Sequence, residues 1–344
     1  METKIVRITD INDRRLIQLG ALIRRGGLVS FPTETVYGLG ANAFDSDAVK
    51  KIFTAKGRPA DNPLIVHLCD LAQLETVAAE IPKTAYALFE HFSPGPLTVI
   101  LKKRSELSDT VTAGLDTVAV RIPSHPIARA LIKEAGVPIA APSSNLSGRP
   151  SPTRAEHVIC DMNGRIDAII DGGPCSVGVE STVVELSSGT VNILRPGGVT
   201  KSDIANLLGS VSVDRHVTEM VSGNETPKSP GMKYKHYSPD AEVIVIVGDI
   251  KFSAEEIRKL LAVQRQNGVA CGVMAYDGCT FDSEAVLYMG GDNKTYAARL
   301  FDSLLSFDRL GIKKVFAQFC NDEDYGLAVS NRLFKAAGGN VIYV

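Results

Sequence analysis

The sequence has few of the features that most directly assign a protein to a class. None of its apolar runs reaches the roughly 18 residues that a membrane-spanning helix needs. Residues 1–7 mix acidic and basic side chains where a signal peptide would have an apolar segment. Residues 241–344 contain neither a Walker A motif nor a GxGxxG motif, so we assign no nucleotide site to them. We therefore expect a soluble, cytoplasmic protein with no membrane partner.

The cysteines lack a metal-binding or disulfide pattern. The sequence has six of them, with no CxxC pair and no histidine at a spacing typical of zinc sites. We expect them to be reduced thiols, mostly buried; they are Cys69, Cys160, Cys175, Cys271, Cys279 and Cys320.

An excess of positive charge is also missing. The chain has 37 Lys and Arg against 39 Asp and Glu, a formal net charge of -2. This balance argues against a protein that binds nucleic acid through its overall charge, although a local basic cleft is compatible with it. The length of 344 residues and the 44% hydrophobic composition instead predict about two domains, each with its own core.

Alternating strand and helix patterns predict an α/β fold in two parts. In residues 1–208 the expected strands are 5–8, 28–31, 64–68, 97–102, 117–123, 166–170, 178–186 and 191–194. The expected helices there are 13–25, 47–55, 71–79, 83–92 and 126–135. Residues 241–344 repeat short strands and longer helices, which predicts a smaller, doubly wound, Rossmann-like α/β domain.

Residues 209–240 separate these two parts and have the composition of a linker. The periodicity fades there, and Ser, Thr, Gly, Asn, Pro and Lys dominate. Its last part, 229–239, adds a methionine, two tyrosines, two lysines and a histidine, which are more reactive and binding side chains than a spacer needs. We therefore expect this segment to dock as a lid.

Two cations stand one residue apart in the segment 55–67. Lys56 and Arg58 follow a predicted helix, and Pro59 and Pro63 restrict the backbone around them. Rigidly held cations suit the recognition of an anion, so this segment is interpreted as an anion clamp. By itself the pattern is equally compatible with a solvated surface turn.

Several predicted strands end in polar segments. Residues 32–40, 142–148 and 178–182 are rich in Ser, Thr, Asn and Gly, and two strands end in Arg121 and Arg195. Ligands of α/β proteins commonly bind where strands end. Each segment alone is typical turn chemistry, but together with the cations they favour one pocket for a phosphorylated or carboxylated ligand.

These motifs resemble a known family. Lys56-x-Arg58, Ser143-x-Asn145 and the segments 32–39, 178–184 and 229–237 are similar, in this order, to L-threonylcarbamoyladenylate synthase. The likeness is to its longer form, with a YrdC-like catalytic domain, and covers nearly the whole chain. It implies a YrdC-like twisted mixed sheet with helices in residues 1–208, a linker or lid in 209–240 and a second domain in 241–344.

The resemblance also implies an activity. L-threonine, bicarbonate and ATP would give threonylcarbamoyl-AMP and pyrophosphate, the first step of threonylcarbamoyladenosine formation at position 37 of tRNA. Mg²⁺ would accompany the ATP. The product would pass to the tRNA threonylcarbamoyl transferase complex, and weak RNA binding is compatible with this role.

The resemblance assigns roles to individual residues. Lys56 and Arg58 would be catalytic, holding the carbon source beside the α-phosphate. The residues expected to bind threonine are Thr35, His67, Arg121, Ala141 and Ser181. The residues expected to bind ATP are Arg58, Asn62, Thr117, Ser143, Asn145, Ser151, Arg195, Tyr234 and His236. Glu34 and Glu180 are expected to pair with a local amide or arginine, rather than to act as an acid and a base.

Two other functions stay open at this stage. The cations Lys50, Lys51, Lys56 and Arg58 could line a concave face that binds double-stranded RNA, as a YrdC-like domain would. The chain's acidic balance, and the Ser, Thr and Asn that replace stacking aromatics between the cations, argue against this alternative. The second alternative is carbamoyl transfer to another acceptor.

Overall fold

The computed structural model describes residues 2–187, 190–218, 237–322 and 324–344. These residues form two compact units. Described residues of 1–147, 151–176 and 180–233 make up the first, and those of 148–150, 177–179 and 234–344 make up the second. The domain limits expected from the sequence, 1–208, 209–240 and 241–344, stay a proposal.

The first unit is built on a mixed sheet of twelve strands among its described residues. The strand order is β1-β9-β2-β3-β8-β4-β7-β6-β10-β11-β12, with β5 paired to β6. The strands are β1 (Lys4–Arg7), β2 (Val29–Phe31), β3 (Gly38–Asn42), β4 (Ile65–His67), β5 (Ala78–Glu80), β6 (Leu97–Lys103), β7 (Thr117–Arg121), β8 (Ile139–Ala140), β9 (Ala168–Asp171), β10 (Thr182–Ser187), β11 (Thr190–Arg195) and β12 (Val211–Val213).

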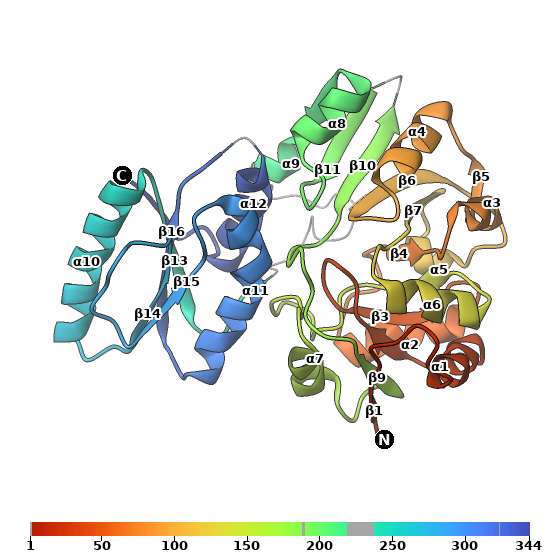
Figure 1. Ribbon diagram of the computed structural model, residues 1–344, viewed down its shortest axis with the longest axis horizontal. Helices are drawn as coiled ribbons and strands as arrows, with labels where there is room; N and C mark the ends of the chain where they lie inside the picture. The colour runs from red at the N-terminus through yellow and green to blue at the C-terminus, as the bar shows by residue number, and fades with distance from the viewer. Residues whose placement is uncertain (1, 188–189, 219–236, 323) are drawn as a thin grey trace. The chain divides into compact units, whose positions relative to one another are not determined.

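Helices pack around this sheet. They are α1 (Arg15–Arg24), α2 (Ser46–Lys56), α3 (Leu74–Val77), α4 (Lys83–Phe92), α5 (Asp109–Thr112), α6 (Pro126–Ala135), α7 (Ala155–Met162), α8 (Lys201–Leu208) and α9 (Arg215–Thr218). Helices α1 and α6 lie side by side although about a hundred residues separate them, as Figure 1 shows. A single turn of 3₁₀ helix, Leu71–Gln73, precedes α3.

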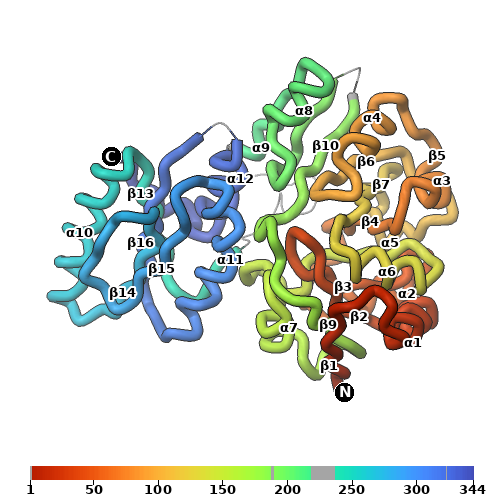
Figure 2. Tube along the Cα trace, viewed as in Figure 1, coloured from red at the N-terminus to blue at the C-terminus, as the bar shows by residue number. Residues whose placement is uncertain are grey.

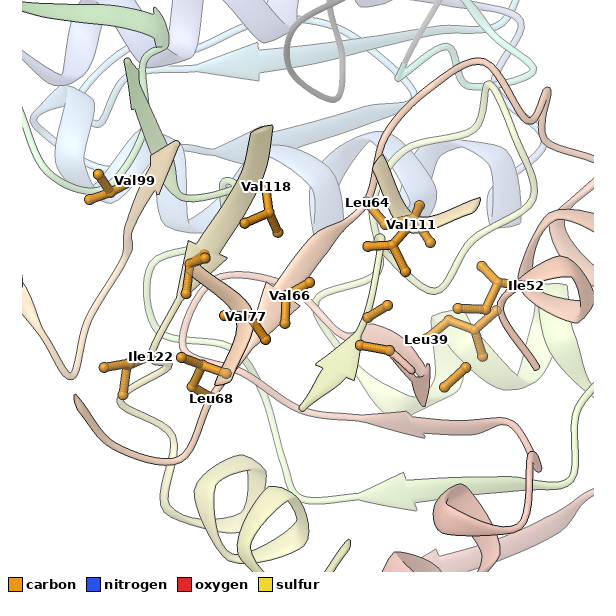
Figure 3. Close-up of a cluster of buried hydrophobic side chains, with 14 of the residues drawn as sticks. Leu39, Ile52, Leu64, Val66, Leu68, Val77, Val99, Val111, Val118 and Ile122 are labelled. Carbon is orange, nitrogen blue, oxygen red and sulfur yellow. The ribbon is translucent and has the colours of Figure 1, made fainter. Parts of the chain in front are cut away.

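The central strands of the sheet have two different faces. Val66, Val99 and Val118 point into the main core, shown in Figure 3. Their neighbours along the strands point to the opposite face, because successive side chains alternate in a strand. On that face Ile65, Ile100, Ala119, Val183 and Leu194 form a separate small apolar cluster. Both faces of the central strands therefore carry buried apolar side chains.

Strand β10 joins the sheet next to a strand far away in the sequence. It pairs in parallel with β6, and Thr98 of β6 lies opposite Val183. The trace in Figure 2 shows these two segments side by side. This pairing brings the polar segment that precedes β10 to the end of the central strands.

The second unit contains a parallel sheet of five strands, in the order β15-β14-β16-β13-β17. Helix α10 covers one face of this sheet, and α11 and α12 cover the other (Figure 1). This arrangement confirms the predicted doubly wound fold. The elements are β13 (Glu242–Val247), α10 (Ile250–Gln266), β14 (Cys271–Ala275), β15 (Ala285–Tyr288), α11 (Asn293–Arg309), β16 (Lys314–Phe319), α12 (Tyr325–Ala336) and β17 (Val341–Tyr343).

Some local predictions were wrong. Residues 71–79 were expected to be one helix, but α3 ends at Val77 and the chain continues as β5. Pairing of Ala78 with Lys103 in β6 stabilises the strand there, so a tertiary contact overrides the local helical pattern. Helices α7 and α8 were not predicted. None of the helices in the described part of the chain is both long and apolar enough to cross a membrane.

Candidate functional site

Three polar side chains form a row across adjacent strands of the first unit. His67 ends β4 and pairs in register with Arg121, which ends β7. Thr98 of β6 lies opposite Arg121 on the other side. All three are buried, and their register places them on the same face as the small apolar cluster. We call them the polar row.

Ser181 and Arg195 extend the polar row on the side of β10. The hydroxyl oxygens of Ser181 and Thr98 lie 2.7 Å apart. Arg195 donates from Nε to the carbonyl oxygen of Ser181 and from Nη2 to its hydroxyl, both at 3.1 Å. Three predicted threonine-binding residues, His67, Arg121 and Ser181, and the predicted ATP-binding residue Arg195 therefore belong to the extended row at the ends of the central strands.

Glu34 closes the other side of the row. Its Oε1 accepts a hydrogen bond from Nη2 of Arg121 at 2.7 Å, and its Oε2 accepts one from the Ser124 amide at 3.1 Å. The expectation that Glu34 pairs with an arginine or a local amide is confirmed. Next to it, the hydroxyl oxygen of the fully buried Thr35 lies 2.9 Å from that of Thr33.

His67 is neutral at physiological pH. Burial, and after it the nearby guanidinium of Arg121, lower the pKa of its imidazole to about 3. Its Nδ1 lies 3.2 Å from the carbonyl oxygen of Ile65. In a neutral ring this contact is a hydrogen bond in the tautomer that carries the proton on Nδ1, because a carbonyl can only accept. His67 therefore adds hydrogen-bonding capacity to the row without adding charge.

Strand β7 connects the polar row to Thr117. Thr117, Ala119 and Arg121 alternate along one strand and so share one face, with about 13 Å between the first and the last. Ala119 belongs to the apolar cluster between them. The amide of Ala141 donates to the carbonyl oxygen of Ile65 at 2.9 Å, which places Ala141 beside this cluster. The face is long enough for a ligand with a polar group at each end.

Lys56 lies at the C-terminal end of α2. Asp45 caps the start of this helix by accepting from the amides of Asp47 and Ala48, and Gly57, with φ of 60°, ends it. The Lys56 side chain is only 2% exposed. Its Nζ donates to the carbonyl oxygens of Ser143 and Asn145, at 2.5 and 2.6 Å.

The segment held by Lys56, residues 143–147, carries two predicted ATP-binding side chains. Ser143 donates from its hydroxyl to Oδ1 of Asn145 at 2.6 Å. Nδ2 of the Asn145 side chain donates to the carbonyl oxygen of Leu146 at 2.9 Å. We call this segment the Ser143 loop. The structure thus brings Lys56, Ser143 and Asn145 together.

Arg58 and Asn62 lie just after α2. Nη2 of Arg58 reaches the carbonyl oxygens of Asn62 and Pro63 at 3.4 and 3.5 Å, both long contacts. Both polar atoms of the Asn62 amide are buried, and neither has a hydrogen-bond partner among the described residues. A buried amide without partners is costly, which fits a side chain placed to receive a ligand.

Ser151 contacts the second glutamate. Its hydroxyl donates to Oε1 of Glu180 at 2.6 Å, and both side chains are buried. The Glu180 carboxylate therefore accepts a hydrogen bond from a buried hydroxyl. The remaining predicted site residues, Tyr234 and His236, lie outside the residues that the structure describes.

Sequence reasoning missed two residues of this region. Thr98 was treated as part of an apolar strand, although a threonine among Leu97, Val99 and Ile100 is a weak signal of a polar contact. Asp161 lies on the unpredicted helix α7, where its Oδ2 accepts from the Leu146 amide of the Ser143 loop at 3.0 Å. No local pattern distinguishes Asp161 from other acidic residues.

The fold and the site together define a class: a mixed α/β protein whose buried cations and hydroxyls gather on one face of a sheet. Two family descriptions match the chain. "Telomere recombination" matches residues 21–197, and "Threonylcarbamoyl-AMP synthase, C-terminal domain" matches residues 199–338. The chain belongs to the threonylcarbamoyl-AMP synthase family, in its two-domain form, and the members of this family are enzymes.

Relatives with this name span nearly the whole chain. Threonylcarbamoyl-AMP synthase of Bacillus subtilis is 49% identical over 99% of this chain and all of its own. The Pyrococcus abyssi protein is 46% identical with the same coverage. The Schizosaccharomyces pombe protein is 41% identical and covers 90% of this chain, which spans 84% of that protein.

Solved structures agree with this assignment. Pyrococcus abyssi Sua5 complexed with L-threonine superposes with a TM-score of 0.94 and 45% identity, and each chain is covered completely. Escherichia coli YciO superposes with a TM-score of 0.51 and 27% identity, over 57% of this chain and 96% of its own. The predicted fold class and the resemblance stated above are therefore confirmed.

Proposed function

We propose that this protein joins L-threonine, bicarbonate and ATP into threonylcarbamoyl-AMP and releases pyrophosphate. This is a nucleotidyl-transfer reaction and the first step of threonylcarbamoyladenosine formation at position 37 of tRNA. Family membership supports the proposal, and so does the L-threonine complex of the Pyrococcus abyssi relative. The geometric observation that carries it is the polar row with its buried Arg121.

Arg121 is suited to bind the threonine carboxylate. Its guanidinium is 4% exposed and lies at a strand end, where it can form paired hydrogen bonds with a carboxylate. The proposed binding residues Thr35, His67 and Ser181 surround it with hydroxyls and a neutral ring, and Ala141 contributes its backbone. Because Thr35, His67 and Ser181 are uncharged, they would add no positive charge near the threonine amine beyond that of Arg121 and Arg195.

The ATP would lie along the rest of the same face. Arg58 and Arg195 would contact its phosphates, and the unsatisfied amide of Asn62 would gain partners. The other proposed ATP contacts are Thr117, Ser143, Asn145, Ser151, Tyr234 and His236. The face between Thr117 and Arg121 supports this placement. Its length, calculated from the rise per residue of a strand, is about 13 Å, which suits an aminoacyl-type adenylate.

The reaction needs positioning and charge more than covalent catalysis. The threonine amine attacks the bicarbonate carbon and water leaves, which gives an N-carboxy group. An oxygen of this group then attacks the α-phosphorus, and the bond to the bridging oxygen of pyrophosphate breaks. Lys56 and Arg58 would offset the negative charge on the phosphates and the carbon source. Holding three reactants together relieves an entropic cost of several kcal/mol.

Mg²⁺ is proposed to enter with the nucleotide. In the described part of the chain no group of three His, Cys, Asp or Glu side chains is placed to hold a metal ion. Phosphate oxygens and water would therefore supply most of its ligands, as is usual for Mg²⁺. Bound in this way, Mg²⁺ would neutralise phosphate charge beside Arg58.

The wider setting of the reaction is also proposed. The adenylate is a mixed anhydride that water hydrolyses readily, so we infer that it passes to the tRNA threonylcarbamoyl transferase complex in the cytoplasm. The expected lid, of which residues 219–236 lie outside the described part of the chain, would limit hydrolysis before this transfer. Weak RNA binding would be compatible with this transfer.

Pyrophosphate release tests the proposal. The purified protein is given ATP and Mg²⁺ with or without bicarbonate, and with L-threonine, L-serine or L-valine. Release should require bicarbonate and be fastest with L-threonine, and it should fall at least tenfold in Arg58→Ala and Arg121→Lys. The exposed Arg104 provides the control Arg104→Ala, which should match the unaltered protein. Release that is independent of threonine, or no release, would reject the proposal.

A further inference from the structure

Asp161 is an acidic residue in an unfavourable place. It lies in the last turn of α7, where the helix dipole disfavours negative charge. Its side chain is also buried, at 7% exposure, so the carboxylate has lost most of its hydration. A residue kept in a position that is unfavourable for its charge often has a function that offsets the loss of stability.

The contact that Asp161 makes is to the Ser143 loop. Its Oδ2 accepts a hydrogen bond from the amide of Leu146 at 3.0 Å. Leu146 directly follows Asn145, so this bond fixes the backbone on which that proposed ATP-binding side chain is mounted. The carboxylate and an amide form a charge-assisted bond, stronger than one between neutral groups.

Lys56 holds the same loop from the opposite side. Its Nζ donates to the carbonyl oxygens of Ser143 and Asn145, and to Oδ1 of Asn145 at 3.3 Å. The backbone carbonyl of Lys56 also accepts from the Ser147 amide at 2.9 Å. Three acceptors around one nitrogen match the three donors of an ammonium group. An uncharged amine could donate only two of these bonds.

The charge on Lys56 is opposed by its surroundings. Burial places the pKa of its ammonium well below the usual value, and the nearby Arg58 lowers it further. Asp161 raises this pKa. Arg58 on the following segment and Asp161 on α7 are the charged groups that act on Lys56 among the described residues. Asp161 therefore favours the form of Lys56 that can make all three bonds.

We propose that Asp161 is a positioning residue of the synthase reaction, which holds the Ser143 loop through Leu146 and keeps Lys56 charged so that it holds the same loop. The inference rests on the proposed function, because its effect is on the proposed ATP contacts of Ser143 and Asn145. Asp161 acts on ATP through the loop and does not touch the reacting atoms.

Two substitutions separate the two parts of this role. Asp161→Asn keeps an oxygen that can accept from Leu146 but removes the charge. We expect the kcat/KM of the variant for ATP to match that of the unaltered protein at pH 6. At alkaline pH, the decline in kcat/KM should begin at least one pH unit lower in the variant than in the unaltered protein. Asp161→Ala also removes the acceptor and should raise the KM for ATP about tenfold, with the KM for threonine unchanged.

The control Asp203→Asn alters another helix-end aspartate of the same unit. Asp203 accepts from the Thr200 amide in the capping box of α8, so its loss affects stability but should move neither KM nor the pH profile. A purely structural Asp161 would behave in the same way. Urea unfolding of each variant shows whether it is folded under the assay conditions.

The outcomes distinguish the two proposals. If the unaltered protein releases no pyrophosphate with threonine and bicarbonate, the proposed function fails. If it is active but Asp161→Asn leaves the alkaline limb unmoved, the proposed effect on Lys56 is overturned. Equal increases of the KM for ATP and threonine in Asp161→Ala would overturn the assignment to the Ser143 loop.

Discussion

Arg121 and Glu34 form an ion pair that is almost completely buried. Nη2 of Arg121 lies 2.7 Å from Oε1 of Glu34, and the two side chains are 4% and 8% exposed. Glu34 provides one anion for a guanidinium that can bind more than one acceptor. The threonine carboxylate in the proposed function would be the second anion, on the side of the polar row. The stability of the unliganded protein and the binding of its substrate therefore depend on the same arginine.

Glu34→Gln should make stability depend on threonine. The variant keeps the shape of the side chain but leaves Arg121 without its buried counter-charge, which costs about 3 kcal/mol of the free energy of unfolding. Saturating L-threonine supplies a carboxylate to Arg121, so we expect a larger increase in melting temperature for the variant than for the unaltered protein. Differential scanning fluorimetry with and without L-threonine measures both effects.

A surface ion pair provides the matched control for this experiment. Glu80 accepts from Lys102 at 2.7 Å, but both side chains are more than half exposed. Glu80→Gln should change the free energy of unfolding by less than about 1 kcal/mol and leave the threonine effect unaltered. An identical shift with threonine in Glu34→Gln and in the unaltered protein would contradict the shared role of Arg121.

His67 should make the protein less stable as the pH falls below neutrality. The pKa of its imidazole falls from 6.5 to about 3 on folding, so the unfolded chain binds more protons between these pH values. The free energy of unfolding therefore decreases as the pH is lowered through this window, by about 2 kcal/mol from pH 7 to pH 5. Urea unfolding at both pH values should show a smaller decrease in His67→Gln, whose side chain does not titrate.

Another histidine tests whether this effect is specific. His91 lies in α4 and is exposed, so His91→Gln should keep the full decrease between pH 7 and pH 5. The difference between the two variants removes the contribution of the carboxylates that titrate in the same range. An equal loss of stability in His67→Gln and in the unaltered protein would contradict the prediction that His67 is neutral in the folded state.

Much of the fold could be predicted because its signals are local. The strands that include Val66 and Val118 are short apolar runs bounded by turn residues, and α2 ends before a glycine, although its cap is Asp45 and not the expected Ser46 or Asp47. These patterns depend on neighbours in the sequence, so the structure reproduces them. The placement of Thr117 and Arg121 on the same face of β7 also follows from the alternation of side chains along a strand.

The specific partners could not be predicted, because they depend on contacts between distant segments. Glu34 and Arg121 are 87 residues apart, and Thr98 and Ser181 are 83 apart. Nothing local indicates that these pairs meet, because strand order decides it and β6 pairs with β10 only in the folded sheet. Asp161 was missed for the same reason, since its partner Leu146 lies on a loop and its helix was not expected.

Gly197 should tolerate no side chain. A Cβ at this position would lie 2.3 Å from the carbonyl oxygen of Glu180 and 2.4 Å from the amide nitrogen of Thr182, and backbone atoms cannot move aside cheaply. Gly197→Ala should therefore displace the start of β10 together with Ser181. We expect a loss of more than about 2 kcal/mol in the free energy of unfolding, measured with urea, and weaker threonine binding.

Gly291 is the matched control for this substitution. A Cβ there would meet no atom within 4 Å, so Gly291→Ala should leave the free energy of unfolding within about 0.5 kcal/mol of the original value. A Gly197→Ala protein of normal stability and threonine affinity would show that the chain after β11 can move away from Glu180.

The hydrogen bond between Thr98 and Ser181 should affect threonine more than ATP. Thr98→Val keeps the shape of a fully buried side chain and removes the hydroxyl that lies 2.7 Å from the Ser181 hydroxyl. Ser181 then loses a partner that fixes its orientation, at a cost of about 1 kcal/mol. We expect the KM for threonine in pyrophosphate release to rise about fivefold and the KM for ATP to change less than twofold.

The control for this variant is Thr76→Val, which removes an exposed hydroxyl that donates to the carbonyl oxygen of Gln73 at 2.6 Å. It should leave both KM values unaltered. An equal rise of the two KM values in Thr98→Val would mean that the hydroxyl supports the whole sheet edge. A rise for threonine alone would instead assign it to the part of the polar row that binds the amino acid, since Thr98 lies between Arg121 and Ser181.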